Sequence, residues 1–348
     1  MLSAIVIVAP HILNREIRDD EEDSTAGDAM AMAAASQDQP GAGLAMVEVL
    51  GRSVVTRVAD ELRRAGLEDI SIFGNDPDGR TIALTQEAST EGTWARATQQ
   101  WITARQSGAE AILVIRLGAY MDVDFKDALL FHFEKGRAVT RAFTRAFDRE
   151  EPLDFWIIDP ARISEDAELL TALNETDPAR YLVPGYVNRL EYAHDLRRLV
   201  VDALTARCSL RPVGKEVRPG VWLDETAQVH RDARVVAPAF IGRGAAIGEQ
   251  CLITRCSSVE GDCQIDYGTV VEDSSILANT YVGIGLDLSH SIVDGNHLMN
   301  LERGVTLEIA DPCVIRQNRI PRQDKSFRSP ARFGFGGMKL SPVEDGLR

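Results

Sequence analysis

Residues 229–277 read VHRDARVVAPAFIGRGAAIGEQCLITRCSSVEGDCQIDYGTVVEDSSIL, and two interleaved patterns run through them. Aliphatic side chains recur at a six-residue spacing: Val229, Val235, Ile241, Ile247, Ile253, Val259, Ile265, Val271 and Leu277. The position four residues after each is small until the last: Ala233, Ala239, Ala245, Cys251, Ser257, Cys263, Thr269, Ser275 and Tyr281. One inward aliphatic residue per hexad suits a short strand before a tight corner, and three strands close a coil of about eighteen residues. The sequence therefore predicts a parallel β-helix that buries one continuous aliphatic column.

The flanks of this stretch extend the prediction. Val217 and Leu223 continue the aliphatic register upstream, and after Leu277 the period is expected to break with a longer step and to resume. The resumed positions are Leu286, Ile292 and Leu298. Turn-forming glycines fall between the predicted strands, among them Gly242, Gly244, Gly248, Gly261 and Gly268. The pattern resembles the hexapeptide-repeat family, and that resemblance implies left-handed coils, against the usual right-handed crossover rule.

Length and composition indicate a two-domain protein. The chain has 348 residues, of which 45% are hydrophobic, which is enough for two cores. Its longest strongly apolar run, residues 4–9, is far shorter than the roughly 20 residues of a membrane span, and no signal-like stretch is found, so we expect a cytoplasmic protein. The net charge of −15 argues against a nucleic-acid partner. The five cysteines form no CxxC pair and are expected to be reduced packing residues, with no metal bound.

The first two hundred residues alternate between predicted strands and helices. Strands are expected at residues 4–9, 70–73, 111–115, 138–143 and 155–158, and helices at residues 53–65, 94–107, 125–135, 166–173 and 192–206. This alternation predicts an α/β domain with an open, mostly parallel sheet and helices on both faces. We expect the α/β domain to span residues 1–210, the β-helix residues 211–311, and a basic, disordered tail residues 312–348.

Two segments fit neither predicted core. Residues 19–43 begin with five consecutive acidic residues and read as a solvated loop; the alternative is a lid that closes over a ligand. The tail is rich in Pro, Gly, Ser and Arg and carries eight Lys or Arg against three Asp or Glu. It either stays disordered or docks on an acidic surface through its phenylalanines.

An α/β domain followed by hexapeptide coils is similar to the layout of the sugar-phosphate nucleotidyltransferases, such as the mannose-1-phosphate guanylyltransferase-like enzymes. Residues 47–70, VEVLGRSVVTRVADELRRAGLEDI, resemble the family segment in which a Gly-Lys/Arg-Pro turn starts the helix before the next strand. Residues 112–140 resemble the family strand that ends in Gly-Asp, with the helix and strand that follow it. The resemblance implies a Rossmann-like nucleotidyltransferase domain and a left-handed β-helix.

The catalytic loop of that family is poorly matched here. Nucleotidyl transfer needs backbone amides and cations around a triphosphate, and family members carry a glycine-rich loop with an arginine, then a Pro-Lys pair. In this chain Pro10 stands where the loop should begin, with no glycine before Gly27 and no lysine before Lys126. Arg15 or Arg18 is the candidate replacement for a missing cation.

The metal-binding positions of the family are also altered. Where family members have Gly-Asp, this chain has Gly118 followed by Ala119, and alanine cannot bind Mg²⁺. Asp122 or Asp124 is the candidate for a displaced ligand, although Asp124 also suits the N-cap of the following helix. The late aspartate of the family is best matched by Asn188, which would be a neutral ligand at best.

These substitutions favour a nucleotidyltransferase-family protein of nucleotide-sugar or polysaccharide metabolism with weak or no catalysis. It would bind a nucleotide sugar or sugar phosphate as a regulator or scaffold, with a pyrophosphorylase subunit as candidate partner. The candidate ligand contacts are Pro10, Gly118 and Asn188. The alternative is an active sugar-1-phosphate nucleotidyltransferase that uses Mg²⁺ with the displaced arginines and aspartates. Exposed faces of the coils favour a homo-oligomer in either case.

A third hypothesis places acyl transfer on the predicted β-helix. Many hexapeptide proteins use a histidine base near a subunit boundary and bind coenzyme A between coils. The candidates are His230, His290 and His297. His230 follows an inward residue and should point outward, whereas the other two lie where the period is expected to break.

Overall fold

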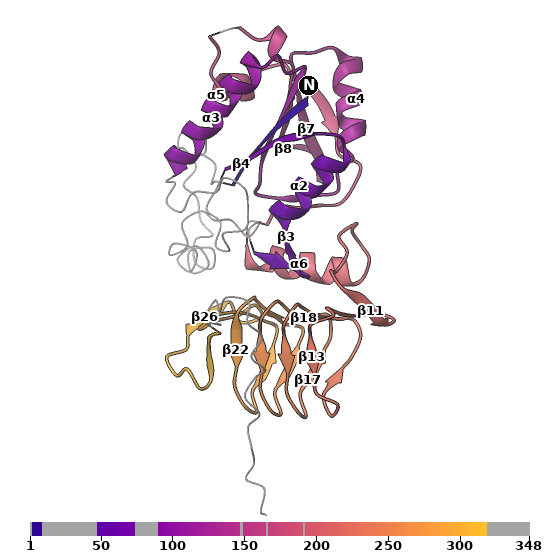
Figure 1. Cartoon of the computed structure of the whole chain (residues 1–348), viewed down its shortest axis with the longest axis vertical. Helices are drawn as coiled ribbons and strands as arrows, with labels where there is room; N and C mark the ends of the chain where they lie inside the picture. The colour runs from indigo at the N-terminus through magenta and orange to yellow at the C-terminus, as the bar shows by residue number, and fades with distance from the viewer. Residues whose placement is uncertain are drawn as a thin grey trace, which may run out of the picture. The chain divides into compact units, whose positions relative to one another are not determined.

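The computed structural model describes residues 2–8, 47–73, 90–146, 149–164, 166–190 and 192–318. They form a mixed α/β protein, with an N-terminal region built on a partly parallel sheet and a C-terminal region of many short parallel strands (Figure 1). No helix within the described ranges is long and apolar enough to cross a membrane. Three predicted site residues, Pro10, Arg15 and Arg18, lie outside the described residues, as do the 19–43 segment and residues 319–348.

The N-terminal sheet has six strands in the order β4-β1-β5-β8-β7-β9. Their bounds are β1 (Leu2–Ile7), β4 (Asp69–Phe73), β5 (Ala111–Arg116), β7 (Val139–Ala146), β8 (Arg149–Ile158) and β9 (Ala179–Leu182). β1 is parallel to both β4 and β5, and its apolar run is buried because neighbours lie on both sides. β8 is antiparallel to β5 and β7, while β9 is parallel to β7. The predicted strands are confirmed, and the β7–β8 hairpin makes the sheet more mixed than predicted.

Helices cover both faces of this sheet. Their bounds are α2 (Val54–Arg64), α3 (Thr90–Gln106), α4 (Phe125–Lys135), α5 (Leu169–Leu173) and α6 (Ala193–Leu204), with a 3-10 turn, η3, at Pro160–Arg162. α3 and α5 lie on one face of the sheet, and α2 and α4 lie on the other (Figure 1). Two short antiparallel pairs complete the region: β2 (Glu48–Val49) with β3 (Arg52–Ser53), and β6 (Tyr120–Met121) with β10 (Val187–Asn188). The alternation of strand and helix read from the sequence is therefore present.

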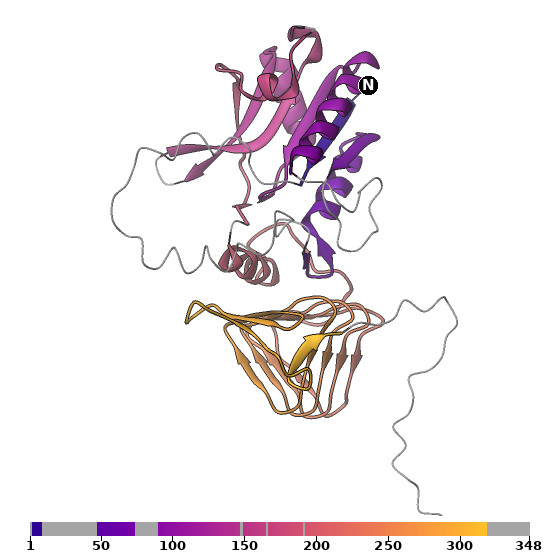
Figure 2. The same cartoon turned by 90° about the vertical axis from the view of Figure 1, so that its left-hand side faces the viewer.

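The stacked-strand region, residues 215–317, is built from short strands in three sheets (Figure 2). The first sheet contains β11 (Lys215–Arg218), β12 (Val221–Leu223), β15 (Ala239–Ile241), β18 (Ser257–Val259), β21 (Ser275–Ile276), β24 (Ser291–Asp294), β25 (His297–Asn300) and β26 (Val305–Glu308). The second contains β13 (Gln228–Val229), β16 (Ala246–Ile247), β19 (Gln264–Ile265), β22 (Thr280–Val282) and β27 (Ile315–Gln317). The third contains β14 (Arg234–Val235), β17 (Leu252–Thr254), β20 (Val270–Glu272) and β23 (Asp287–Ser289). From β12 to β24, each strand is parallel to the strand three positions further along, an arrangement compatible with a parallel β-helix.

The predicted aliphatic column occupies the interior of this region from Val235 to Val271, and Leu223 and Val229 pack against it partly buried. The prediction is wrong for Val217, which is 45% exposed on β11 because that strand turns back antiparallel to β12. Val235 pairs with Ile253 and Ile241 pairs with Val259, one coil apart. The side chains of these two pairs are buried in a single apolar cluster, and Cys251 joins them in a small-residue slot. The packing role predicted for the cysteines in these slots is therefore confirmed.

The interior column changes phase after Val271, where the sequence prediction is wrong. Ile276 rather than Leu277 faces the interior. It pairs with Val259, and the sequence separation of this pair is one residue shorter than that of the earlier pairs. Leu277 instead packs into the core of the N-terminal region. No longer step follows: the next interior positions are Val282, Leu288 and Val293, in place of the predicted Leu286, Ile292 and Leu298.

A shortened corner is the physical cause of the phase change. In the coil before the change, the corner that leads into β18 contains two left-handed residues, Arg255 with φ 53° and Cys256 with φ 57°. In the next coil Asp273, with φ 44°, is the left-handed residue at this corner, and in the following coil it is His290, with φ 49°. Each later corner is one residue shorter, so every interior position beyond it moves back by one.

The same shift explains the tyrosine that interrupts the small-residue pattern. The small slots of the later coils are filled by Ser274 and Thr280, both fully buried, and not by Ser275 and Tyr281. Ser274 links successive corners, because its amide donates to the Ser257 hydroxyl at 3.2 Å and its own hydroxyl accepts from the next serine amide one coil later. Tyr281 thus interrupts the small-residue pattern because the six-residue period shifts by one residue before it.

The C-terminal end of the stacked-strand region lies further along the chain than predicted. β27 pairs antiparallel with β22, and Ile315 is 2% exposed in the interior cluster. Residues 312–318, predicted to begin the basic tail, therefore close the end of the region.

A buried carboxyl group joins the stacked-strand region to the turn before α2. Glu260 is 1% exposed and accepts hydrogen bonds from the amides of Leu50 and Gly51, both at 2.9 Å. Gly51 has φ +88°, and a Cβ there would lie 2.9 Å from the Val213 Cβ and 3.2 Å from the Phe240 ring. Glycine is required at this turn both by its left-handed backbone and by the close approach of these side chains.

The phase change predicts different costs for two isoleucines of the same coil. Ile276→Ala should destabilise the protein by about 2–5 kcal/mol because it leaves a cavity in the interior column. Ile284→Ala, at a side chain that is 65% exposed, should change stability by less than about 0.5 kcal/mol. Urea unfolding of both variants checks this expectation. Equal costs would show that residue 276 does not face the interior.

Glu260 predicts a pH dependence of stability. Burial raises the pKa of this carboxyl from 4.5 to about 8, against the opposing effect of the amides of Gly51 and Leu50. Between these values the folded chain holds a proton that the unfolded chain has lost, so the contribution of Glu260 to stability is fully present below about pH 4.5 and is lost as the pH rises through 8. Glu260→Gln cannot titrate and should lose less stability over this interval. Unfolding midpoints at pH 5, 6, 7 and 8, measured for both proteins, test this, and parallel curves would contradict it.

Candidate functional site

The carboxyl ends of β1 and β5 form the point at which the strand order of the N-terminal sheet reverses. β4 and β5 lie on opposite sides of β1, and their chain connections leave in opposite directions. The backbone continues the sheet at this edge, since the Leu117 amide donates to the Ile7 carbonyl at 2.8 Å and the Val8 amide to the Phe73 carbonyl at 2.7 Å. Open α/β sheets bind ligands in the crevice outside such carboxyl ends.

Four side chains gather beside this edge and are named here the edge cluster: Arg116, Arg141, Asp154 and Trp156. Arg116, the last residue of β5, forms an ion pair with Asp154 of β8, and their side chains are 15% and 21% exposed. Arg141 of β7 lies 4.0 Å from the other oxygen of Asp154, and its guanidinium stands 5.1 Å from the centre of the Trp156 ring. Strand pairing builds the cluster, because Arg141 is the register partner of Trp156.

The edge cluster has a net positive charge on a strongly negative protein. Two guanidinium groups share one carboxylate, whereas the whole chain carries −15. Burial lowers the pKa of Arg141, and Asp154 opposes this effect, so the group stays charged at neutral pH. A half-buried, ring-stacked arginine is suited to phosphate or carboxylate groups, which guanidinium binds in a bidentate manner.

Gly118 lies next to the edge cluster. Its amide donates to the Arg116 carbonyl at 3.1 Å, and a Cβ added to it would meet the Arg116 guanidinium at 3.6 Å. Because Gly118 has no side chain, the backbone at this position can lie close to a ligand bound by the Arg116 guanidinium. The role itself stays a prediction.

Asp122 and Asn188 are brought near one another but are held by the fold. The pairing of β6 with β10 sets Asn188 opposite Tyr120, two residues before Asp122. The Asp122 carboxylate accepts hydrogen bonds from both the amide and the hydroxyl of Ser209. The Asn188 side chain accepts from the Leu190 amide at 3.0 Å and donates to a carbonyl of α6 at 2.9 Å. Both predicted ligands thus have structural partners.

Asp124 occupies the N-cap of α4, the second of its predicted roles. Its carboxylate accepts from the amides of Lys126 and Asp127 at 2.9 and 3.2 Å. Within the described ranges no three His, Cys, Asp or Glu side chains lie together in an arrangement that could hold a metal ion. Asp122 and Asp124 therefore have roles within the fold, and the Mg²⁺ site that the resemblance implies stays a prediction.

The three candidate histidines occupy separate places in the stacked-strand region. His230 is exposed, as predicted, and accepts from the Asp232 amide at 3.2 Å. His290 forms a shortened corner and lies 2.6 Å from the Asp273 carboxylate. His297 is exposed at the start of β25. Two of the three histidines thus lie beside a carboxylate, and His290 is the closer, since His230 lies 3.7 Å from the Asp232 carboxylate.

The edge cluster was missed in the sequence, although a signal was present. The strand of Arg116 reads AILVIR and that of Asp154 ends in LDFWII, so each places a charge within or directly after an otherwise buried run. No protein-family model matches the chain, and no curated protein matches it either. The resemblance to nucleotidyltransferases therefore depends on layout and short motifs alone.

The capping role of Asp124 can be separated from a ligand role by two substitutions. Asp124→Ala should cost about 1 kcal/mol of stability because two helix amides lose their acceptor. Asp124→Asn keeps an acceptor and should be nearly neutral. Thermal unfolding of both variants, with and without Mg²⁺, tests this. A Mg²⁺-dependent stabilisation that both variants lose would instead indicate metal binding.

Proposed function

We propose that the protein binds a nucleotide sugar or sugar phosphate at the edge cluster and acts as a regulator or scaffold of nucleotide-sugar metabolism, with weak or no nucleotidyl transfer. In this proposal the N-terminal region is a nucleotidyltransferase-like domain and the stacked-strand region is a left-handed β-helix. The observation that carries it is the position of Arg116 at the carboxyl end of β5, beside the reversal point of the sheet and the backbone of Gly118, where it shares Asp154 with Arg141 of β7.

The chemistry of the edge cluster supports binding of a phosphorylated ligand. Arg141 is held by its stacking on Trp156 and by a hydrogen bond from its Nε to the Leu153 carbonyl at 3.3 Å, which fixes the guanidinium plane. A phosphate group can displace part of the shared interaction with Asp154 and take bidentate hydrogen bonds from the fixed arginine. Pre-positioned side chains reduce the entropic cost of binding.

The residues at the family's metal positions support weak or absent catalysis. Ala119 follows Gly118 where the resemblance expects aspartate, and Asp122 and Asn188 have partners within the fold. Transfer to a sugar phosphate needs neutralisation of several phosphate charges at once. Binding through arginine needs no metal, so the fold supports recognition without the chemical step.

Assembly and location are part of the same proposal. We place the protein in the cytoplasm, as a homo-oligomer that associates with a pyrophosphorylase subunit. Leu130 and Phe133 of α4 are 62% and 50% exposed, one helical turn apart, and offer an apolar surface for such an association.

Acyl transfer is the second candidate function, favoured by one contact. The His290 imidazole lies 2.6 Å from the Asp273 carboxylate, an arrangement that can orient a histidine base. Coenzyme A binding at millimolar concentration would support this function, and its absence would remove it.

Binding and turnover can be measured on the same full-length protein. We expect little or no pyrophosphate release with Mg²⁺ over a panel of nucleoside triphosphates and sugar 1-phosphates. Calorimetric titration with nucleotide sugars should show saturable binding that Arg141→Gln weakens about tenfold, because one charge-assisted interaction is lost. Arg145→Gln removes the same charge from an exposed position of the same strand and should leave the affinity unchanged.

Two results would contradict the proposal. Rapid pyrophosphate release would identify an active nucleotidyltransferase and would move its catalytic groups to residues outside the edge cluster. Equal affinities of the Arg141 and Arg145 variants, both shown to be folded by thermal unfolding, would remove the edge cluster as the ligand site.

A further inference from the structure

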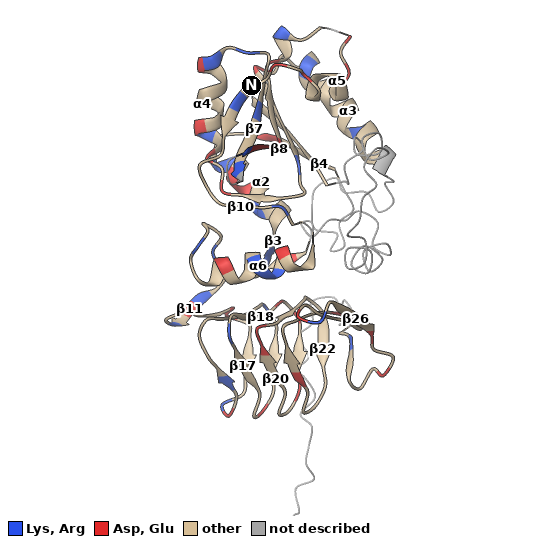
Figure 3. Cartoon of the chain, turned by 180° about the vertical axis from the view of Figure 1, so that it is seen from behind, with Lys and Arg blue, Asp and Glu red and all other residues tan. Residues whose placement is uncertain are grey.

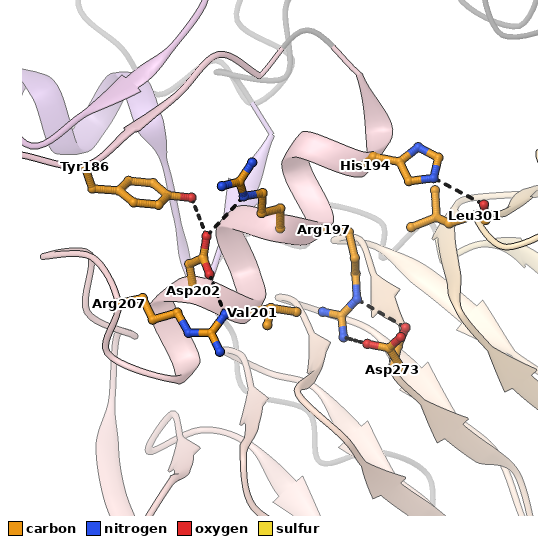
Figure 4. Close-up of a pocket in the computed structure, with 9 residues that line it drawn as sticks. Tyr186, His194, Arg197, Val201, Asp202, Arg207, Asp273 and Leu301 are labelled. Atoms are coloured by element: carbon orange, nitrogen blue, oxygen red, sulfur yellow. Dashed lines mark hydrogen bonds and ion pairs between the residues drawn. The ribbon is translucent and has the colours of Figure 1, made fainter. Parts of the chain in front are cut away.

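A pocket lies between α6 and the stacked-strand region, separate from the edge cluster (Figure 4). Its volume is about 530 Å³, within the range of small-molecule sites. Arg197, Arg198 and Asp202 of α6 line one side, and Asp273 and Leu301 line the other. Basic and acidic residues follow one another along α6 (Figure 3).

One wall of this pocket is fixed by Arg197. The side chain is 7% exposed, and its guanidinium donates to the carbonyls of Arg255, Cys256 and Asp273 as well as to the Asp273 carboxylate at 2.7 Å. These acceptors belong to the corners where the phase of the coils changes. Arg197 thus has its hydrogen-bonding capacity used by the fold and holds α6 against the corners.

The opposite part of the pocket contains two arginines that are only loosely held. Arg198 and Arg207 approach the same carboxylate, that of Asp202, at 3.6 and 3.5 Å, and their side chains are 72% and 69% exposed. Asp202 itself is 7% exposed and accepts a hydrogen bond from the Tyr186 hydroxyl at 2.7 Å. A buried carboxylate therefore fixes the place at which both guanidinium groups converge, while leaving most of their donors directed elsewhere (Figure 4).

The charge and size of the pocket select its ligand. Three arginines oppose two carboxylates, and His194 adds a further ring nitrogen beside Leu301. Because Arg197 and Asp273 neutralise one another, the accessible charge is that of Arg198 and Arg207 against Asp202 alone. A convergent pair of guanidinium groups matches the oxygens of a phosphate, and the volume leaves space for a small attached group.

We infer that this pocket binds a small phosphate monoester, whose phosphate bridges Arg198 and Arg207. The rest of the ligand would lie along α6 toward Val201 and Leu301, where the lining is apolar. Since Arg197 of the same helix anchors the corners, a ligand here also braces α6 against the stacked-strand region. The inference does not depend on the proposed function of the edge cluster.

Calorimetry on the full-length protein tests the inference with three probes at constant ionic strength: inorganic phosphate, glycerol 3-phosphate and glycerol. We expect saturable binding of glycerol 3-phosphate, and no binding of glycerol. The double variant Arg198→Gln/Arg207→Gln should weaken binding by at least about tenfold, since charge-assisted hydrogen bonds are lost. If inorganic phosphate binds as tightly as glycerol 3-phosphate, the pocket takes the phosphate group alone, and the inferred ester is overturned.

The matched control is Arg63→Gln/Arg64→Gln on α2. These arginines are 53% and 69% exposed and also pair with carboxylates on their own helix, so the control removes equal charge from a similar setting. It should bind glycerol 3-phosphate like the unaltered protein. Absence of saturable binding, or equal weakening in both double variants, would overturn the site. Failure at this pocket would leave the difference between the Arg141 and Arg145 variants in nucleotide-sugar binding in place, so it is distinguishable from failure of the proposed function.

Discussion

The stacking of one coil on the next is the constraint on which the rest of the structure depends. Each interior aliphatic side chain must lie beside its equivalent one coil away, because the parallel ladders fix the register at every corner. The region satisfies this constraint even where the sequence loses a residue, by exchanging a two-residue left-handed corner for a single Asp273 or His290. The interior column stays continuous, and the outer surface changes.

That change at the corners gives α6 its position. The exposed carbonyls of Arg255, Cys256 and Asp273 become acceptors for Arg197, and the displaced Leu277 turns toward the apolar core of the N-terminal region. Near another part of the same sheet, Glu260 accepts the amides of the turn before α2. In both contacts, buried polar groups satisfy one another's hydrogen bonds. Removing one partner would leave the other buried without a hydrogen bond, which would lower the stability of the fold.

Two arginine-containing sites follow from this architecture, and they are built differently. The edge cluster is formed by strands, with Arg141 stacked on a ring and sharing Asp154 with Arg116. The α6 pocket is formed by a helix, with Arg198 and Arg207 converging on a buried carboxylate. In both, two arginines share one carboxylate, whereas Asp124 caps α4 and Asp122 accepts from Ser209.

The sequence by itself determined the architecture, because strand and helix periods are local and the hexad repeats many times. It indicated the buried strands, the helices between them, the interior column up to Val271 and the cap at Asp124. Only the tertiary structure decided the phase of the later coils, since a corner shortened by one residue can be recognised only from the pairing of the strands on either side of it. It also decided both arginine sites. Strand pairing brings Arg116 to Asp154, and the return of the chain after α6 brings Arg207 to the side of Arg198. No local sequence pattern indicates either contact.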